Sequence, residues 1–264
     1  MPRVVLITGA SSGLGKAIAE AFAGKGDTVY GTSRGQFEHP LFHTLTLDVD
    51  DTGSCQAAVG EVIRREGRLD VLVNNAGFGI GGALELTGDD EMLAQFQTNF
   101  FGALRMSRAV LPVMRQQGRG RIIQISSAAA AIPIPFQALY AASKAALECA
   151  SQALAMEVKP FHIKVSCVQF GDMKTGFTGS RRMVAGCEGD SVYREKSDRS
   201  VARMEKDEQN GPTPEKAAKL VLKVAGKRRP KALYTKGIFY KAVVLARRVL
   251  PLRFSNWLIG KLYG

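Results

Sequence analysis

The first fifteen residues constrain what this chain can fold into more than any other segment. Val4-Val5-Leu6-Ile7 is wholly apolar, which is typical of a parallel strand buried on both faces. The glycine-rich stretch Thr8–Gly15 follows directly and runs into a helical pattern. Such a strand-to-helix turn presents free N–H groups to an anion such as a pyrophosphate. We expect Gly9 to permit a tight turn, Gly13 to let the backbone approach that anion, and Gly15 to allow close helix packing.

Strand-like and helix-like patterns alternate along the rest of the chain. Short apolar runs predict further strands at 28–32, 44–47, 71–73, 121–126, 163–169 and 231–235. Helical spacing predicts helices at 54–66, 88–117, 138–158 and 213–226. This alternation predicts an α/β fold, in which a doubly wound, Rossmann-like parallel sheet carries helices on both faces. We therefore expect residues 1–264 to form a single domain.

Two segments depart from this alternation. Residues 176–212 are rich in Gly, Ser and mixed charges, which predicts a substrate lid with some helix. Residues 236–264 contain two amphipathic helical patterns, 238–250 and 255–262. The chain's 36 Lys and Arg against 24 Asp and Glu give a formal charge of +12, which is unevenly distributed. Residues 1–210 carry 23 basic and 23 acidic side chains, whereas residues 211–264 carry 13 basic side chains and one acid, Glu215.

Cysteine and histidine usage argues against several classes of protein. The four cysteines lie far apart and form no CxxC pair. This spacing argues against a disulfide framework, a redox dithiol and a zinc ribbon. The three histidines are not joined by a carboxylate cluster, so we expect no metal site. The N-terminus passes directly into a strand, and no apolar run is long enough to span a bilayer. These features predict a cytoplasmic protein without a signal peptide.

The end of the second expected strand indicates which dinucleotide the chain prefers. A site for NAD places an acidic side chain there to hold the ribose 2′-hydroxyl, whereas this chain has Ser33. Arg34 follows, and its guanidinium can hold a 2′-phosphate through two hydrogen bonds. The pair predicts NADP(H) rather than NAD(H), unless Arg34 is simply a solvated loop residue.

A tyrosine and a lysine four residues apart, Tyr140 and Lys144, share one face of an expected helix. A free phenol, with a pKa of about 10, is a poor acid or base at neutral pH. A neighbouring ammonium stabilises the phenolate and lowers that pKa, as proton exchange with an alcohol oxygen requires. Ser127 ends the preceding strand, which favours this interpretation over an exposed helical pair. Ser126 points to the opposite side of the strand, and we assign it a structural role.

Several motifs occur together in this chain. Thr8–Gly15 reads TGxxxGxG, Asn74–Gly77 reads NNAG, and Ser127 lies thirteen residues before the YxxxK motif of Tyr140–Lys144. In their order and spacing, these motifs resemble those of the short-chain dehydrogenase/reductase family. The resemblance extends from the first strand to at least Thr175.

The resemblance implies a role for each member of a catalytic set. Tyr140 would be the general acid in carbonyl reduction and the general base in alcohol oxidation. Ser127 would hydrogen-bond the substrate oxygen, and Lys144 would also hold the nicotinamide ribose. Asn99 matches a helix asparagine that supports a water-mediated proton relay; the alternative is a polar residue that only kinks the helix.

The same resemblance implies the cofactor contacts. The glycine loop would meet the pyrophosphate, other loops the adenine and its ribose, and a threonine the carboxamide. The residues concerned are Gly9, Ser11, Ser12, Gly13, Leu14, Gly15, Ser33, Arg34, Asp48, Val49, Asn75, Ala76, Gly77, Tyr140, Lys144 and Thr175.

Two phenylalanines narrow the resemblance. Phe170, where the family commonly has proline, and Phe177 resemble the steroid- and retinol-dehydrogenase-like branch. The resemblance implies an NADP(H)-dependent homo-oligomer that interconverts a lipophilic ketone or aldehyde with its alcohol by hydride transfer. One alternative is a 3-oxoacyl-thioester reductase with a basic surface for a carrier phosphate at its pocket mouth. Another is a non-catalytic NADP(H)-binding sensor or scaffold, which would have no need of Ser127 and Tyr140.

The basic segment 236–264 has two interpretations. Its apolar and aromatic residues are interleaved with Lys and Arg, as in a helix lying on anionic lipid, which would give peripheral membrane contact. Alternatively, the apolar stripe packs onto the core or a second subunit while the charges stay solvated, as many large enzymes cap their cores. We favour this second arrangement. Nucleic-acid binding ranks last, because the segment has no aromatic platform on a strand and no recognisable reading helix, so we expect no nucleic-acid partner.

Overall fold

Seven parallel strands form the central sheet of the protein. The computed structural model describes residues 2–187 and 192–263, apart from the side chains of Phe177, Thr178 and Arg248. The strands are β1 (Val4–Ile7), β2 (Thr28–Ser33), β3 (His43–Thr46), β4 (Val71–Asn74), β6 (Gly120–Ser127), β7 (Ile163–Phe170) and β9 (Leu233–Thr235). Their order is β3-β2-β1-β4-β6-β7-β9, so the direction of winding reverses between β1 and β4. The predicted doubly wound parallel sheet is confirmed.

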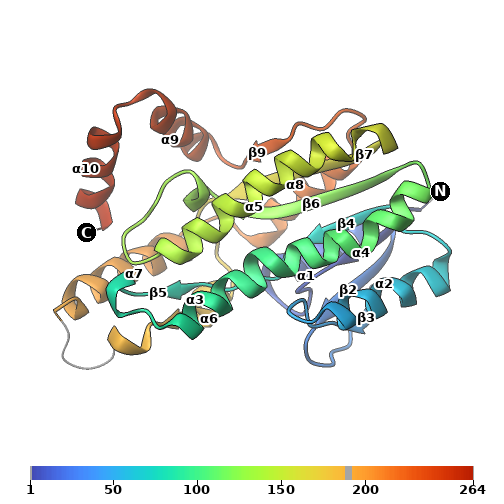
Figure 1. Ribbon diagram of the computed structural model, residues 1–264, viewed down its shortest axis with the longest axis horizontal. Coiled ribbons are helices and arrows are strands. Elements are labelled where there is room, and N and C mark those ends of the chain that lie inside the picture. Colours follow the sequence, from blue (N-terminus) through green and yellow to red (C-terminus); the bar gives the residue numbers. More distant parts are fainter. Residues whose placement is uncertain (1, 188–191, 264) are drawn as a thin grey trace.

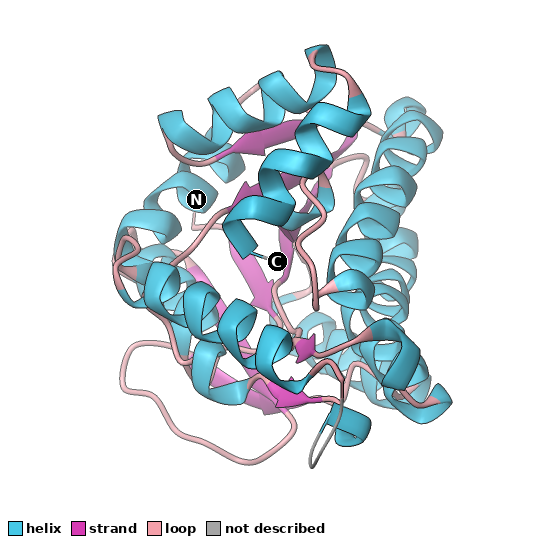
Figure 2. Ribbon diagram, turned by 90° about the vertical axis from the view of Figure 1, so that its left-hand side faces the viewer, coloured by secondary structure: helices cyan, strands magenta, loops and turns pink. Residues whose placement is uncertain are grey.

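Helices cover both faces of this sheet (Figures 1 and 2). They are α1 (Gly13–Ala23), α2 (Thr52–Glu66), α3 (Asp89–Phe96), α4 (Ala103–Gln116), α5 (Ala138–Glu157), α6 (Phe177–Ser180), α7 (Arg194–Gln209), α8 (Pro214–Gly226), α9 (Ile238–Val249) and α10 (Leu252–Tyr263). Alternate residues of a strand serve opposite layers: Val5 and Ile7 pack with α1 and α8, whereas Val4 and Leu6 pack with α2 and α4. Both faces of the sheet are therefore buried at β1, which explains why this strand is wholly apolar.

Local signals account for most element boundaries. Asp51 caps α2 by accepting a 2.5 Å hydrogen bond from the N–H of Ser54. Helix α8 begins with Pro214 at its first position, after Thr213, whose side chain makes no capping hydrogen bond. The expected helix at 88–117 is interrupted by a π-helical segment, Gln97–Gly102, between α3 and α4. The structure also adds a small second sheet that the sequence did not predict. Its strands, β5 (Ile80–Gly81) and β8 (Arg182–Met183), are too short to leave a pattern in the sequence.

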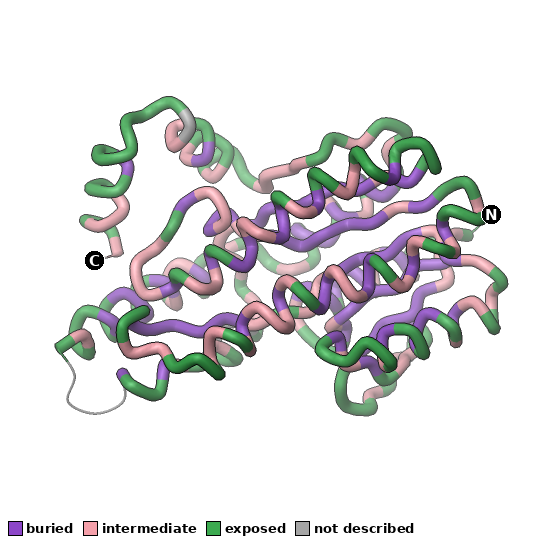
Figure 3. Tube along the Cα trace, viewed as in Figure 1, coloured by how far each residue is buried: buried purple, intermediate pink, exposed green. Residues whose placement is uncertain are grey.

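Two segments extend beyond the layered core. Residues 176–212 contain α6, β8 and α7. Within this segment, residues 188–191 lie outside the described part of the chain. The C-terminal helices α9 and α10 project from one end of the molecule, and α10 contacts α7. Most of this helix pair is exposed in Figure 3. Within the described residues, no helix has the length and apolar character needed to cross a membrane.

Candidate active site

The glycine loop between β1 and α1 has the backbone geometry expected of it. Gly9 and Gly13 adopt positive φ angles of 67° and 54°. A Cβ on Gly15 would lie 2.0 Å from the main-chain oxygen of Gly9, so only glycine lets the helix approach the loop this closely. The predicted roles of Gly9 and Gly15 therefore fit the structure, whereas the approach of an anion to Gly13 stays a prediction. The first residues of α1, Gly13 to Gly15, line a cavity.

Asn75 holds this loop in place. Its side-chain NH₂ donates to the main-chain oxygens of Thr8 at 2.9 Å and Gly9 at 3.0 Å. The hydroxyl of Thr8 in turn accepts from the main-chain N–H groups of Asn75 and Ala76, both at 2.9 Å. The NNAG stretch thus braces the glycine loop across the β1–β4 pair. The sequence suggested only an adenine-ribose contact here, because it gives no sign of a bond between residues so far apart.

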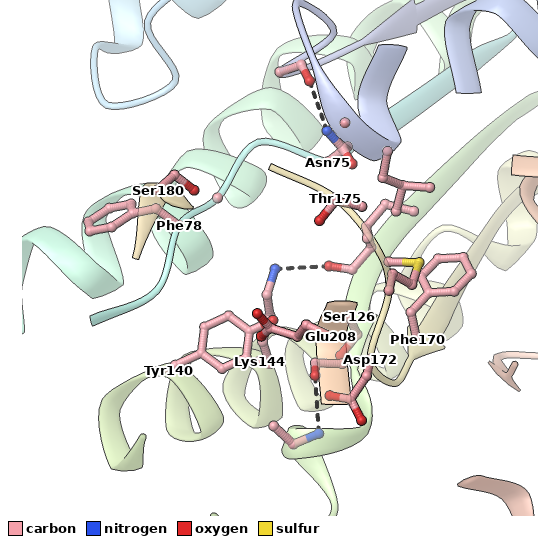
Figure 4. A pocket seen from close by; sticks show the side chains of 18 of the residues that line it. Asn75, Phe78, Ser126, Tyr140, Lys144, Phe170, Asp172, Thr175, Ser180 and Glu208 are labelled. Atoms are coloured by element: carbon pink, nitrogen blue, oxygen red, sulfur yellow. Dashed lines mark hydrogen bonds between the residues drawn. The ribbon is translucent and has the colours of Figure 1, made fainter. Parts of the chain in front are cut away.

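A cavity of about 810 Å³ opens at the carboxyl ends of the strands, where a doubly wound sheet binds its ligand. All sixteen residues that the sequence assigned to the cofactor line it, from the glycine loop to Thr175. Ser127 also lines the cavity, while Asn99 does not. Figure 4 shows Asn75, Tyr140, Lys144 and Thr175 around this space.

Ser127, Tyr140 and Lys144 converge in the cavity. Ser127 ends β6, and Tyr140 and Lys144 stand one helical turn apart at the start of α5. The ammonium of Lys144 donates to the main-chain oxygen of Ile125 at 3.0 Å and lies 5.9 Å from the centre of the Tyr140 ring. The predicted triad is therefore assembled by two neighbouring elements, a strand end and the first turns of a helix.

Burial dominates the protonation of this triad. It raises the pKa of Tyr140 to about 12, although a hydrogen bond with Ser127 acts in the opposite direction. Burial also lowers the pKa of Lys144 to about 8, while nearby Cys167 and Glu148 favour its charged form. Burial of the phenolate thus acts against the lowering of the Tyr140 pKa expected from Lys144, and that lowering stays a prediction. At neutral pH, Tyr140 holds its proton.

Asn99 lies in the π-helical segment and is buried behind Gly77. Its side-chain oxygen accepts from the N–H of Phe78 at 3.0 Å, and its NH₂ donates to the oxygen of Phe78 at 2.9 Å. A Cβ on Gly77 would lie 3.0 Å from that side-chain oxygen. Its position in the helix irregularity fits the alternative interpretation as a kink-forming residue, and its carboxamide positions the chain after β4. The proton relay stays a prediction.

Ser126 is among the residues that line the cavity, but its hydroxyl bonds into a buried polar network, which fits the structural role expected of it. Its hydroxyl donates to Glu148 at 2.5 Å, and the NH₂ of Gln169 donates to both oxygens of the same carboxylate, at 2.8 and 3.0 Å. Thr235 of β9 donates to the side-chain oxygen of Gln169 at 2.7 Å. Glu148 is one turn beyond Lys144 on α5. The sequence did not identify this carboxylate, because its partners come from β6 and β7.

Arg34 is exposed at the rim of the cavity, just beyond β2. Within the described part of the chain, no carboxylate pairs with its guanidinium. The Ser33 hydroxyl turns back to the main chain, donating to the oxygen of Gly35 at 3.0 Å. A free guanidinium beside an uncharged serine is suited to an added phosphate, and would leave a 2′-hydroxyl without an acidic partner.

The C-terminal segment also reaches this site. Tyr240 of α9 packs against Gly171, where a Cβ would lie 2.0 Å from the ring. Its hydroxyl donates to the Asp172 carboxylate and accepts from the Asp172 N–H at 3.1 Å. Burial raises the pKa of Asp172. Cavity-lining residues contributed by α9 and α10 are Phe239, Tyr240, Val243, Leu258, Ile259, Leu262 and Tyr263.

The 176–212 segment forms another wall. Met204 and Glu208 of α7 line the cavity, and Glu208 pairs with Arg181 at 2.5 Å. The Arg181 side chain is only 1% exposed. The mixed charges that marked this segment in the sequence are thus partly internal ion pairs. The resemblance to the steroid- and retinol-dehydrogenase-like branch rested on Phe170 and Phe177. The side chain of Phe177 lies outside the described part of the structure.

Comparison with known proteins identifies relatives over nearly the whole chain. The short chain dehydrogenase family matches residues 3–184. A 3-ketodihydrosphingosine reductase of Bacteroides thetaiotaomicron is 46% identical over 87% of this chain and 86% of its own length.

Solved structures extend the comparison. A short-chain dehydrogenase from Streptomyces avermitilis superposes with a TM-score of 0.85 at 34% identity, over 98% of this chain and 96% of that chain. A serine dehydrogenase complexed with NADP⁺ has a TM-score of 0.75 at 26% identity, over 88% of this chain and 93% of that chain. Structures that share the fold are known with NAD as well as with NADP.

Proposed function

Because the chain belongs to the short-chain dehydrogenase family, as an oxidoreductase of CH–OH groups, we propose that it is an NADP(H)-dependent enzyme. Its reaction would interconvert a lipophilic ketone or aldehyde with its alcohol. The observation that carries this proposal is the convergence of Ser127, Tyr140 and Lys144 on one cavity with the glycine loop. A bound nicotinamide would supply or accept the hydride. The cradle around Gly9 and Gly15 and the unpaired Arg34 fit a phosphorylated dinucleotide.

Each residue of the triad has a part in the proposed reaction. The Ser127 hydroxyl holds the substrate oxygen beside Tyr140. Tyr140 gives its proton to the oxygen as negative charge develops there in reduction, and takes one back in oxidation. The high pKa of Tyr140 keeps it in the acid form that reduction requires at neutral pH. The buried ammonium of Lys144 stabilises the resulting phenolate, and would hold the ribose of the cofactor.

The substrate class follows from the walls of the cavity and from the relatives. The helices α9 and α10 contribute mainly apolar and aromatic side chains, which suit an alkyl chain. The name of the Bacteroides relative denotes a long-chain ketone, and we propose a ketone of this kind as the substrate. Residues 176–212 would act as its lid. The exposed Lys241 and Lys261 keep a 3-oxoacyl thioester as the second candidate, since they offer a basic surface near the mouth.

Finer predictions about the setting of the enzyme accompany this proposal. We propose a cytoplasmic homo-oligomer whose basic C-terminal segment packs inward with one face, as favoured from the sequence, and contacts a membrane peripherally with the other. The support for membrane contact is the excess of basic over acidic residues in 211–264, together with the exposure of the apolar side chains of α9 and α10. Support for self-association is the family membership alone.

Turnover of a panel of carbonyl compounds with NADPH and NADH tests the proposed function. The panel contains long-chain ketones, fatty aldehydes, steroids, retinoids and 3-oxoacyl thioesters. We expect the wild type to reduce a long-chain ketone and to prefer NADPH. Tyr140→Phe should lower kcat at least about a hundredfold, because it removes the proton donor and keeps the ring. Arg34→Ala should reduce the preference for NADPH about tenfold or more, because it removes a charge-assisted contact.

Three outcomes would contradict parts of the proposal. Full turnover by a folded Tyr140→Phe protein would refute the mechanism. An unchanged cofactor preference in Arg34→Ala would refute the assignment of the 2′-phosphate. Faster reduction of acyl thioesters than of long-chain ketones would favour the second candidate. Lys25→Ala is the matched control for Arg34→Ala, since Lys25 is an exposed cation away from the cavity.

A further inference from the structure

The outer surface of α9 carries apolar side chains where a solvated helix normally has polar ones. Ile238, Leu245 and Val249 are 88%, 62% and 74% exposed, and their spacing, together with Ala242, places them on one helix face. The opposite face already packs inward through Tyr240 and Val244. Both faces of α9 are therefore apolar, and only one of them is covered by the protein.

The helix α10 repeats this arrangement. Phe254 and Trp257 are about half exposed, at 49% and 55%, and their rings stack with centroids 5.9 Å apart. Lys261 lies one turn further on the same face, with its ammonium 5.2 Å from the Trp257 ring centre. Aromatic rings beside a lysine are typical of helices at the level of lipid headgroups.

Charge distinguishes a lipid surface from a second copy of this chain as the occupant. No acidic residue occurs from 216 to 264, whereas Lys241, Arg253 and Lys261 are exposed on or beside the apolar faces. A symmetric contact between two such surfaces would bring like charges together. An anionic bilayer matches both the charge and the apolar side chains.

The same surface continues into the active-site cavity. Phe239, Leu258 and Leu262 are exposed by 68%, 44% and 53%, and they also line the cavity that holds Tyr140. The mouth of the cavity therefore lies within the apolar surface and not beside it. A lipophilic molecule that entered between α9 and α10 would pass mainly apolar and aromatic side chains on its way to the catalytic residues.

We propose that α9 and α10 form a membrane-docked entrance, which binds an anionic bilayer by its outer faces and passes a lipophilic substrate from the bilayer into the cavity. This inference rests on the proposed function for the nature of the substrate. Docking itself depends only on the outer apolar and basic residues.

Trp257 provides the test, because it is the only tryptophan of the chain and lies on the proposed contact face. Its fluorescence would be recorded for the full-length protein with vesicles of phosphatidylcholine alone, or of equal parts phosphatidylcholine and phosphatidylglycerol. We expect a blue shift and flotation of the protein with the anionic vesicles. Leu245→Gln with Phe254→Gln should weaken vesicle binding about tenfold or more, because both changes remove apolar area outside the cavity.

The control is Leu41→Gln with Met156→Gln, two exposed apolar residues outside the C-terminal helices and outside the cavity lining; this variant should bind vesicles like the wild type. The Leu245/Phe254 variant should keep its turnover of a short, water-soluble ketone and lose about tenfold in kcat/KM for a vesicle-embedded one. Absence of the blue shift in the wild type, or equal binding by the variant, would overturn the inference. The inference would also be overturned if the wild type bound no vesicles but formed a dimer, and if the Leu245/Phe254 variant were monomeric. Failure of the proposed function would appear separately, as no turnover of the short ketone.

Discussion

At the scale of single residues, the site depends on charged side chains that are buried away from water. The ammonium of Lys144 has an ordinary pKa of 10.5 and a pKa of about 8 in the folded protein. Near neutral pH the buried ammonium therefore lowers the free energy of unfolding. This unfavourable contribution diminishes as the pH rises from 8 to 10.5, because Lys144 loses its proton in the folded protein before it does so in the unfolded chain. Glu148 offsets part of this cost, because it stands one turn away and favours the ammonium. Such a cost is typical of a residue retained for its chemistry.

Glu148→Gln tests whether this carboxylate keeps Lys144 charged. Glutamine has the same shape, but the pKa of Lys144 loses a stabilising negative charge and should fall below about 8. The alkaline limb of the pH profile of kcat/KM should therefore move to lower pH, by on the order of one unit. Glu157→Gln is the control, since Glu157 is exposed on the same helix. An unchanged limb in Glu148→Gln would limit this residue to a structural role.

At the scale of elements, the strand-to-helix connection at the glycine loop sets how closely α1 approaches the sheet. Gly15 touches the loop backbone directly, whereas Gly60 on α2 has nothing within 4 Å of the position of its missing Cβ. Both glycines lie inside helices, so intrinsic helix propensity affects them alike. Their difference comes entirely from packing against a second element.

The two corresponding alanine variants should differ in sign. Gly15→Ala should lower the free energy of unfolding by about 3 kcal/mol or more, because the clash at 2.0 Å is with main-chain atoms that cannot move aside. Gly60→Ala should raise it by about 0.5 to 1 kcal/mol through helix propensity. Chemical denaturation of both proteins without cofactor measures the difference. Equal stability of the two variants would show that α1 can shift away from the loop.

At the scale of the whole molecule, the segments around the cavity are fastened by a few long-range polar contacts. Tyr240 ties α9 to Asp172 after β7, and the Tyr263 hydroxyl donates to Asp207 of α7 at 3.3 Å. The C-terminal helices are thus linked to the core at one end and to the 176–212 segment at the other. Figures 1 and 3 show how little else covers them.

Tyr240→Phe combined with Tyr263→Phe should loosen the helix pair and leave the sheet intact. Tyr240→Phe removes two hydrogen bonds to Asp172 and Tyr263→Phe removes one to Asp207; each bond is worth about 1 kcal/mol, and both rings are kept. Limited trypsin digestion at Lys241 and Arg247 should then accelerate about thirtyfold or more, since cleavage follows the population of the open form. Tyr193→Phe, which removes a 2.6 Å bond to Glu85, is the control. Equal digestion rates would mean that apolar packing alone holds the helices.

The sequence by itself determined the parts of this protein that depend on local periodicity and spacing. Alternating strands and helices predicted the doubly wound sheet, because dry strands must be apolar on both faces. Three glycines and the Tyr140–Lys144 interval predicted the cradle and the catalytic face, because a turn or a helix fixes such geometry over a few residues. The family resemblance added the roles of Ser127, Tyr140 and Lys144.

Only the tertiary structure decided what joins distant residues. Asn75 braces the loop at Thr8 from 67 residues away, and Tyr240 closes over Gly171 across a similar distance. The pKa of Tyr140 rises although a lysine stands one turn away, because burial depends on every element around it. The basic C-terminal segment lay outside the catalytic part of the chain in sequence, yet folding brings its helices to the mouth of the site. Short-range patterns cannot encode that contact, because it forms only when the core is already built.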